Sequence, residues 1–487
     1  SWLGERRTSG LSDFLVAPRA YGPVIIALAL GATTCSAAAT MGNPGLVFNF
    51  GWPGLWYGMG YGGICVAWAL TSYKLSIVGN NINSKSLPDF MGKRFDSQPL
   101  RLITAVVTLL NVYYIAGQFS GAGWVFDKIL HVPYGIGIIG GSIFIALYIM
   151  AGGTHADVLN CAVQGAIMLF LAIIVSVAVL FYVGDLSAIN AALTAQNAKY
   201  SWDVVFAEPM FNALTGPGIM LSLSLFALQP QLSKLWFALK DERDVPKALI
   251  GGYIFMFFMG LLMWLGGLGA RAITPNSRPD LAVLDMLSQT LATPLVAIAG
   301  VGILSAIMST LAGLMLVVAI AAANDIFRDF IVPRWMKGLS AERADRITLL
   351  ATRFMVPVVM IIGLIIAYDP PKFLTALMWV GIGAFAGGVS PVLVLGCTWR
   401  RTTKLGAEAG TFLGFGTYLV CYFVLGQSMG IGLFKVPWAG STIAMIVGFA
   451  ATILVSLATK PMPEEMLNKL FDTHKKVKTA EAGNTAS

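Results

Sequence analysis

Long stretches without a charged side chain are the feature of this sequence that most constrains its fold. Residues 20–73 and 286–324 contain no Asp, Glu, Lys or Arg, and each is longer than the roughly 20 apolar residues with which a helix crosses a bilayer core. Only 11% of all residues are charged, whereas an average soluble domain carries about 25%. The sequence therefore predicts a protein embedded in a lipid bilayer, and it excludes a cytosolic enzyme, a secreted disulfide scaffold and a nucleic-acid binder.

The apolar stretches predict an all-α polytopic membrane protein with about twelve transmembrane helices. Helices are preferred to barrel strands because the runs are long and continuous. The predicted spans cover residues 20–41, 52–77, 101–128, 133–151, 157–184, 213–238, 246–271, 293–324, 342–368, 372–398, 404–426 and 437–459. A short segment from Leu281 to Thr290 is expected to form a separate helix on the membrane surface before the eighth span.

The distribution of Lys and Arg predicts the orientation of these spans. If the N-terminus is cytoplasmic, the segments on that side hold 24 of the 32 basic residues and the outside loops hold six. This bias places both termini of the chain on the cytoplasmic side of the cell (plasma or inner) membrane. Residues 1–19 then form a cytoplasmic segment, and residues 460–487 form a solvated, largely disordered tail.

Two spans carry uncharged oxygen groups at mid-membrane depth. In the first span, small and hydroxyl residues follow Gly31, and an unwound turn there would expose carbonyls that a cation, a ligand or water must satisfy. In the eighth span, the adjacent hydroxyls of Ser309 and Thr310 suit a weakly held monovalent cation. The alternatives are close helix packing through small residues and hydroxyls that bond back to their own helix.

The sixth span contains a second expected break, at Gln229-Pro230-Gln231. Pro230 removes a backbone donor and frees a carbonyl, although a simple proline kink is the alternative. Lys234 is expected to extend to the cytoplasmic face. The two breaks lie five helices apart, as in an inverted repeat of five plus five helices. The predicted units are a first repeat at 20–184, a second repeat at 213–398, and two additional C-terminal helices at 404–459.

At these residues the chain resembles the sodium:solute symporter family, and it looks closest to the pantothenate permease branch. The resemblance covers most of the chain, from roughly Arg6 to Arg401. The stretches that carry it are Tyr21-Gly22-Pro23, Ala32-Thr33-Thr34-Cys35-Ser36, Met41-Gly42-Asn43-Pro44-Gly45, Ala151-Gly152-Gly153, Val158-Leu159-Asn160-Cys161, Gln164-Gly165, Gln229-Pro230-Gln231, Lys240-Asp241, Ala306-Ile307-Met308-Ser309-Thr310 and Asn324-Asp325-Ile326-Phe327.

The resemblance implies a secondary active transporter that imports a small organic solute with sodium ions (Na+) by alternating access. It places the sodium ligands at the carbonyls of Ala32, Cys35 and Ala306 and at the hydroxyls of Ser309 and Thr310. It places the solute beside that site, and the expected contacts are Thr34, Ser36, Gln118 and Gln229. A monocarboxylate such as pantothenate is supported by the resemblance, and a neutral polar solute fits the same groups equally well.

Three departures from the family pattern bear on mechanism. Many members carry an Asp where this chain has Cys161, and additional hydroxyls where it has Ala312 and Gly313. Those groups serve a second cation in some relatives, so their loss favours one sodium ion per cycle or a changed exit route. Members also usually begin with one more helix before the stretch that corresponds to residues 11–23, and this helix is expected upstream of residue 1.

Two other readings of the chain compete with sodium symport. A proton-coupled transporter usually has a buried acid, and none is expected in the core spans, because Asp127 and Asp157 are interpreted as helix caps. A solute sensor would need a signalling domain, and the tail is short. An enzyme is not expected, since His131 and His155 are placed at loop edges and form no acid–base or metal set.

Overall fold

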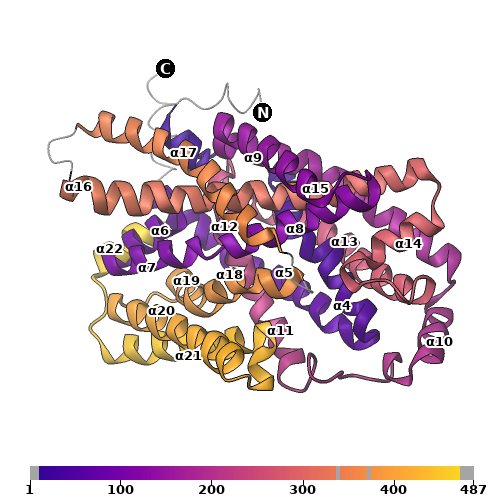
Figure 1. The fold of residues 1–487 in the computed structure, drawn as a ribbon. Helices are drawn as coiled ribbons and strands as arrows, with labels where there is room; N and C mark the ends of the chain where they lie inside the picture. Colours follow the sequence, from indigo (N-terminus) through magenta and orange to yellow (C-terminus); the bar gives the residue numbers. More distant parts are fainter. Residues whose placement is uncertain (1–9, 336–339, 370–373, 472–487) are drawn as a thin grey trace.

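The computed structural model describes residues 10–335, 340–369 and 374–471 as a bundle of helices (Figure 1). The prediction of an all-α membrane protein is confirmed. Within the described residues, eight helices are long and apolar enough to cross a membrane, and the bent first span makes nine. The expected total of twelve spans stays a prediction.

The first half of the chain, up to the break in the sixth span, forms a set of helices of very different lengths. They are α2 (Leu11–Val16), α3 (Pro23–Thr34), η1 (Ala38–Gly42), α4 (Asn43–Phe50), α5 (Leu55–Asn81), α6 (Leu87–Phe95), α7 (Gln98–Leu109), α8 (Val112–Ile129), α9 (Tyr134–Tyr182), α10 (Leu186–Gln196), α11 (Thr215–Ser224) and η4 (Leu225–Leu228).

The second half continues the bundle to the end of the described chain. Its helices are α12 (Pro230–Ala238), α13 (Val245–Ile273), η6 (Pro279–Leu281), α14 (Ala282–Thr290), α15 (Thr293–Ile320), η7 (Ala321–Ile331), α16 (Val332–Trp335), α17 (Ala341–Ala367), α18 (Leu374–Gly388), α19 (Ser390–Thr398), α20 (Lys404–Leu419), η8 (Val420–Ser428), α21 (Pro437–Ala458) and α22 (Glu464–Phe471). The short helix expected at 281–290 is present as η6 and α14.

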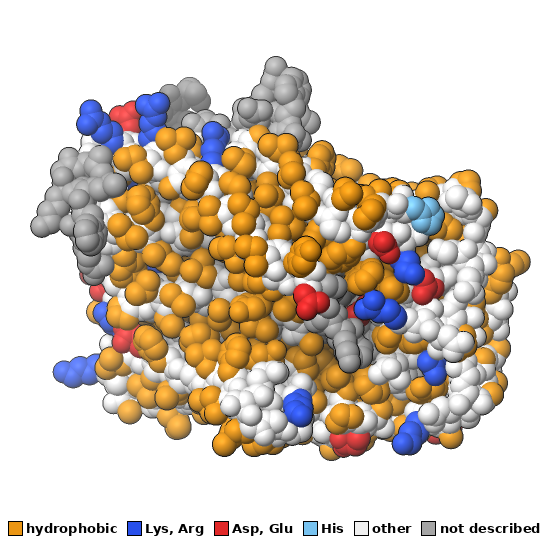
Figure 2. Space-filling view, in the orientation of Figure 1, with side chains coloured by type: hydrophobic (Ala, Val, Ile, Leu, Met, Phe, Trp, Pro, Cys, Tyr) orange, Lys and Arg blue, Asp and Glu red, His pale blue; other side chains and the backbone are white. Residues whose placement is uncertain are grey.

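The surface of the bundle matches a lipid environment. Hydrophobic side chains cover most of the face in Figure 2, and many of the Lys, Arg, Asp and Glu side chains lie near its edges, with a further group right of centre. Large apolar side chains such as Phe181, Phe257 and Ile365 are more than half exposed. In Figure 1, α6 and α22 lie at one end of the bundle, and α10 and α14 lie at the other.

Both predicted helix breaks are present, and local sequence explains each. The first span bends by 59° between α3 and the segment Ala38–Phe50, and the Ser36 hydroxyl accepts a hydrogen bond from the Ala38 N–H at 3.1 Å, as a helix-capping serine does. In the sixth span, Gln229 adopts φ −52° and ψ 146°. A residue before proline avoids the helical region, and Pro230 opens α12 at the first helical position, where its missing N–H does no harm.

The predicted spans at 133–151 and 157–184 form one run, α9, which is interrupted at Gly153. This glycine has φ 51° and ψ −135°, a backbone conformation that side-chain-bearing residues rarely adopt. A Cβ atom at this position would lie 2.6 Å from the Phe14 carbonyl oxygen. The glycine therefore permits both the kink and the close approach of α2.

We expect Gly153→Ala to lower the free energy of unfolding by about 1–3 kcal/mol through backbone strain alone, which is the range for one strained position. The clash with Phe14 adds to that strain. Thermal unfolding of the purified protein measures the effect, with Gly140→Ala in the same helix as the control, because a Cβ at Gly140 meets no atom within 4 Å. An unfolding temperature equal to that of the wild type would contradict this account of the kink.

The C-terminal segment differs from the expected disordered tail. Residues Glu464–Phe471 form α22, in which Leu467 and Leu470 are buried. The Asn81 side-chain amide donates to the Leu470 carbonyl at 3.0 Å, and the Arg94 guanidinium lies 4.7 Å from the Phe95 ring and 5.4 Å from the Phe471 ring. The prediction was wrong here because two apolar residues one turn apart suffice to dock a short helix. Residues 472–487 lie outside the described chain.

Candidate functional site

The expected sodium ligands of α15 lie directly against the break in the first span. The Ser309 hydroxyl donates to the Ala32 carbonyl at 2.9 Å and lies 3.0 Å from the Ala306 carbonyl. The Thr310 hydroxyl donates to the Thr33 carbonyl at 3.0 Å and lies 3.3 Å from the Ala306 carbonyl. All of these side chains are buried. The two hydroxyls thus bridge α3 and α15 rather than only bonding back within their own helix.

This group of oxygens has the chemistry that an alkali ion requires. Backbone carbonyls and hydroxyls are hard, uncharged ligands, and they gather where α3 ends and its last carbonyls lack helical partners. Cys35 lies in the turn itself, with φ −91° and ψ 92°, and its thiol approaches the Met256 sulfur at 3.7 Å. Its side chain therefore faces α13, so only its backbone is available as a ligand. The Thr33 carbonyl belongs to the same cluster, although the sequence did not single it out.

Ser36 and Gln118 meet at the start of the second half of the broken span. The Gln118 side-chain oxygen accepts from the Ala37 N–H at 3.0 Å, and the Ser36 hydroxyl accepts from the Ala38 N–H at 3.1 Å. Both backbone donors point out of the N-terminal end of the segment Ala38–Phe50, where the helix dipole favours negative charge. Two neutral side-chain acceptors therefore occupy an end that suits an anion.

Gln229 reaches the same helix as Gln118, although the sequence predicts that the two belong to different repeats. The Gln229 side-chain nitrogen lies 3.4 Å from the Ile382 carbonyl, and the Gln118 side-chain nitrogen lies 3.5 Å from the Met378 sulfur. Met378 and Ile382 are four residues apart and share one face of α18. The sequence did not predict that α18 takes part, because its apolar, glycine-rich run carries no polar signal.

An aromatic contact joins the two segments that carry these glutamines. Tyr114 lies one turn before Gln118 on α8, and its ring packs edge-to-face on Phe226, with centroids 6.1 Å apart. Phe226 lies three residues before the break at Gln229. The fourth expected solute contact is Thr34. Its hydroxyl donates to the Leu30 carbonyl of its own helix at 2.6 Å, and so bonds back within α3.

Lys234 and Asp157 contradict the sequence interpretation. Lys234 does not extend to the membrane surface, since it is only 4% exposed, and its ammonium lies 2.6 Å from the carboxylate of the fully buried Asp157. Asp157 lies in the first turn after the Gly153 break in α9, and its carboxylate contacts Lys234 and the Cys161 sulfur rather than acting as the predicted helix cap. His155 is likewise buried inside α9 and not at a loop edge. The glycine kink moves this part of the chain into the protein core.

A second buried acid lies at the end of the bundle that includes α6. The Arg101 guanidinium binds Asp325 at 3.0 Å and Asp89 at 3.2 Å, and it also contacts Asp329. The Ser86 hydroxyl donates to Asp325 at 2.7 Å. Nearby, burial lowers the pKa of the Lys85 ammonium, and the Arg328 charge adds to this effect. Asp157 thus contradicts the expectation that the core spans contain no buried acid, whereas Asp325 directly follows the predicted eighth span. Both acids are ion-paired.

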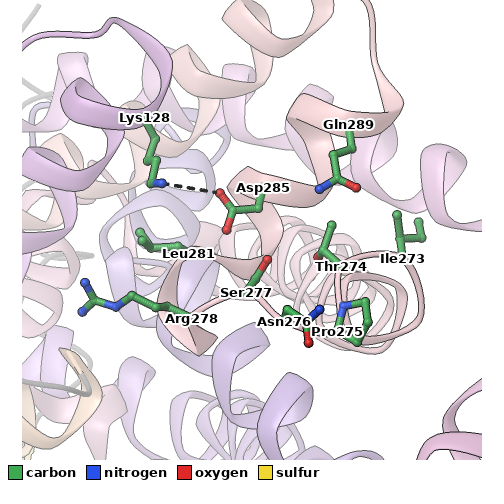
Figure 3. A pocket seen from close by; sticks show the side chains of 10 residues that line it. All are labelled: Lys128, Ile273, Thr274, Pro275, Asn276, Ser277, Arg278, Leu281, Asp285 and Gln289. Carbon is green, nitrogen blue, oxygen red and sulfur yellow. Dashed lines mark ion pairs between the residues drawn. The ribbon is translucent and has the colours of Figure 1, made fainter.

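A polar cavity near the other end of the bundle is a separate feature (Figure 3). It has a volume of about 460 Å³ and lies between the end of α8, the loop after α13, and α14. Lys128 and Asp285 face each other across it at 4.0 Å. The backbone of η6 in turn packs on α4, since a Cβ at Gly45 would lie 2.8 Å from the Pro279 carbonyl oxygen. The loop after α13 thus covers the second half of the broken first span.

Known proteins resemble this chain in both sequence and fold. The chain is 27% identical to the high-affinity proline transporter PutP of Bacillus subtilis (strain 168), over 97% of this chain and 98% of the relative. It is also 27% identical to the sodium/pantothenate symporter of Escherichia coli (strain K12), over 91% and 92% of the two chains.

Solved structures extend the likeness in fold. A Na+-coupled sialic acid symporter in a substrate-bound outward-open state matches with a TM-score of 0.76 and 15% identity, over 94% of both chains. A nucleobase-cation-symport-1 family transporter in a closed conformation matches with a TM-score of 0.56 and 12% identity, over 97% and 98% of the two chains. The chain has the five-plus-five inverted-repeat fold of such transporters.

The family profile of the sodium:solute symporters matches residues 14–414. That range contains every group of the site described above, from the α3 carbonyls to the α18 contacts of the two glutamines. The chain belongs to the sodium:solute symporter family, and it is therefore a sodium-coupled membrane transporter of a small-molecule solute and not an enzyme.

Proposed function

We propose that this protein imports a small monocarboxylate, coupled to one sodium ion held between α3 and α15. The observation that carries the proposal is the pair of hydrogen bonds from Ser309 and Thr310 to the Ala32 and Thr33 carbonyls. Sodium would be bound by these oxygens together with the carbonyls of Ala306 and Cys35. The hydroxyl protons would then turn away and leave their lone pairs to the ion.

Sodium binding would prepare the solute pocket because the two sites share the same turn. Ala32 and Cys35 lie on one side of the break, and Ser36 and Ala37 lie on the other. An ion that fixes the turn against α15 also fixes the N–H groups of Ala37 and Ala38. Preorganised donors bind an anion more tightly than mobile ones, so sodium raises the affinity for the solute.

A carboxylate is the solute group that fits the second half of the first span best. The N–H groups of Ala37 and Ala38 now donate to Gln118 and Ser36, and a carboxylate could replace these weaker, neutral acceptors. The buried Gln229 side-chain oxygen has no hydrogen-bond partner among the described residues, and it can accept from a hydroxyl, amide or ammonium of the solute. The relatives include a pantothenate symporter and a proline transporter, and both solutes carry one carboxylate.

Counterflow in proteoliposomes tests this function directly. Labelled pantothenate and labelled proline are each offered with sodium or choline outside, to vesicles loaded with the unlabelled solute. We expect sodium-dependent accumulation of a monocarboxylate, and no accumulation of the corresponding amide, because the amide lacks the charge that the N–H groups favour. Equal movement of acid and amide would contradict the carboxylate assignment. Binding of a solute without any movement would instead indicate a sensor.

Transport direction and topology follow from the same proposal. The end of the bundle that carries α6, α7 and α22 includes Lys93, Arg94, Arg101 and Lys469, and these basic residues support a cytoplasmic location for it. The ion pairs of Arg101 with the α6 and η7 acids would then close the inner side of α15 while the site faces outward. Their release would open the path into a sodium-poor cytoplasm.

A further inference from the structure

The buried pair of Lys234 and Asp157 has no role in the mechanism above, yet it lies in the centre of the bundle. The ammonium and the carboxylate are 2.6 Å apart, and their side chains are 5% and 0% exposed. Either charge alone would be very unfavourable at this depth, because burial strips its water. Each charge therefore needs the other to be stable at this depth. An apolar contact between α9 and α12 would pack equally well, so the presence of two charges calls for an explanation.

The pair lies one side chain away from the proposed sodium oxygens. The Cys161 sulfur is 3.5 Å from the Asp157 carboxylate and 3.5 Å from the Ser309 carbonyl. The same sulfur is 3.6 Å from the Thr33 hydroxyl. Since the Thr33 carbonyl accepts from Thr310, a charge at Asp157 or Lys234 is separated from the sodium site only by a thiol and a hydroxyl.

The surroundings of Asp157 offer further ligand groups and little bulk. A Cβ at Gly313 would lie 3.3 Å from the Gln231 Cβ and 3.9 Å from the Asp157 carboxylate, so α15 presents only hydrogen at this point. Gln231 is fully buried, and neither its side-chain oxygen nor its nitrogen has a hydrogen-bond partner among the described residues. An unpartnered buried amide indicates a missing ion or water. Carboxylate, amide and hydroxyl oxygens are the ligands that a hard cation prefers.

A small cavity connects Lys234 with the α6 end of the bundle. Its volume is about 20 Å³, enough for one water molecule. It is lined by Lys234 and Pro230 on one side and by Lys85 and Ser86 on the other. Removing the long Lys234 side chain would enlarge this cavity, so water and small ions could reach Asp157.

We propose that the Lys234 ammonium is a built-in cation, which fills a place where Asp157 and Gln231 would otherwise bind an alkali ion beside the sodium site. This inference rests on the proposed sodium site between α3 and α15. The tethered charge neutralises Asp157 permanently and cannot leave during the cycle. One sodium ion is then bound per cycle, and α9 and α12 stay joined at this point in every state.

The test counts bound sodium ions through thermal stability, a measurement that needs no solute. A ligand that binds the folded state adds stability in proportion to the logarithm of its concentration once it is in excess, and each bound ion contributes equally to that slope. Purified protein is unfolded at increasing sodium concentrations, with choline keeping the ionic strength constant. We expect Lys234→Ala to show about twice the sodium slope of the wild type, because Asp157 recruits a second ion.

Two further variants separate the carboxylate from general damage. In Lys234→Ala/Asp157→Asn the second site lacks its charge, so the slope returns to the wild-type value. In Asp157→Asn alone, the ammonium is unpaired near the sodium site and raises the sodium dissociation constant by about tenfold or more. Asp185→Asn, which removes an acid at the exposed start of α10, is the matched control. It leaves the sodium slope and the sodium dissociation constant unchanged.

Each remaining outcome decides the inference. A Lys234→Ala slope equal to the wild-type slope would overturn it. The inference would also be overturned if Lys234→Ala stays unfolded in molar sodium while Lys234→Ala/Asp157→Asn folds. Asp157 would then be unable to bind a sodium ion in place of the ammonium. A wild type without any sodium slope would instead refute the sodium site itself, so the two failures are distinguishable.

Discussion

Replacing both hydroxyls of the sodium site by Ser309→Ala/Thr310→Ala should raise the sodium concentration for half-maximal uptake by at least about 100-fold. Each contact with a charged partner contributes about 1.5–3 kcal/mol, and every ~1.4 kcal/mol is a factor of ten. Two lost ligands therefore remove sodium stimulation over the whole accessible concentration range. Uptake of labelled solute into proteoliposomes, measured against external sodium, gives the result.

The control for this variant is Ser305→Ala on the same helix. The Ser305 hydroxyl is also buried, but it donates to the Val301 carbonyl of its own helix at 2.8 Å. Its removal should leave the sodium dependence unchanged. If the double variant folds and keeps the wild-type sodium dependence, the ligand assignment is wrong.

The second large effect is expected for Gln118→Glu, which places a carboxylate against the Ala37 N–H group. That carboxylate would satisfy the helix end permanently and repel a solute anion. Two like charges about 4 Å apart repel by about 4 kcal/mol at an effective dielectric constant of 20. We expect the KM for a monocarboxylate to rise at least about 100-fold, measured as initial uptake rate against solute concentration.

Gln118→Ala provides the comparison that makes this prediction specific. It removes one amide without adding charge, so we expect a KM increase of only about tenfold, corresponding to one hydrogen bond. Gln196→Ala on the exposed helix α10 serves as the remote control. If Glu and Ala at position 118 impair uptake equally, the solute carries no negative charge at this end of the helix.

The breaks and the hydroxyl pair could be predicted from sequence because each depends on a local signal. Proline after Gln229 disfavours a helical conformation for that residue. Adjacent hydroxyls in a membrane helix commonly bond back to their own helix, so their assignment to an ion also needed the family resemblance. The family resemblance also implied Gln118 and Gln229 among the expected solute contacts. Their convergence on α18 could not be predicted, because it depends on how the two repeats pack.

The buried ion pair shows the limit of reading charge along a sequence. Lys234 lies near the cytoplasmic end of the predicted span 213–238, and Asp157 begins the predicted span 157–184, so each was assigned to a membrane edge. The positive φ of Gly153 redirects α9 and carries Asp157 into the core, where it meets the start of α12. Only the three-dimensional structure shows that these two charged residues, each expected at a membrane edge, form an ion pair in the core.

The central claim is that sodium bound between α3 and α15 shapes the neighbouring solute pocket, and reciprocal binding tests it most directly. The dissociation constant of the solute is measured with sodium and with choline, and that of sodium is measured with and without saturating solute. By linkage the two ratios must be equal, and we expect both to be about 5–150-fold in the wild type and about 1 in Ser309→Ala/Thr310→Ala. A solute that binds the wild type equally tightly in sodium and in choline would contradict the claim.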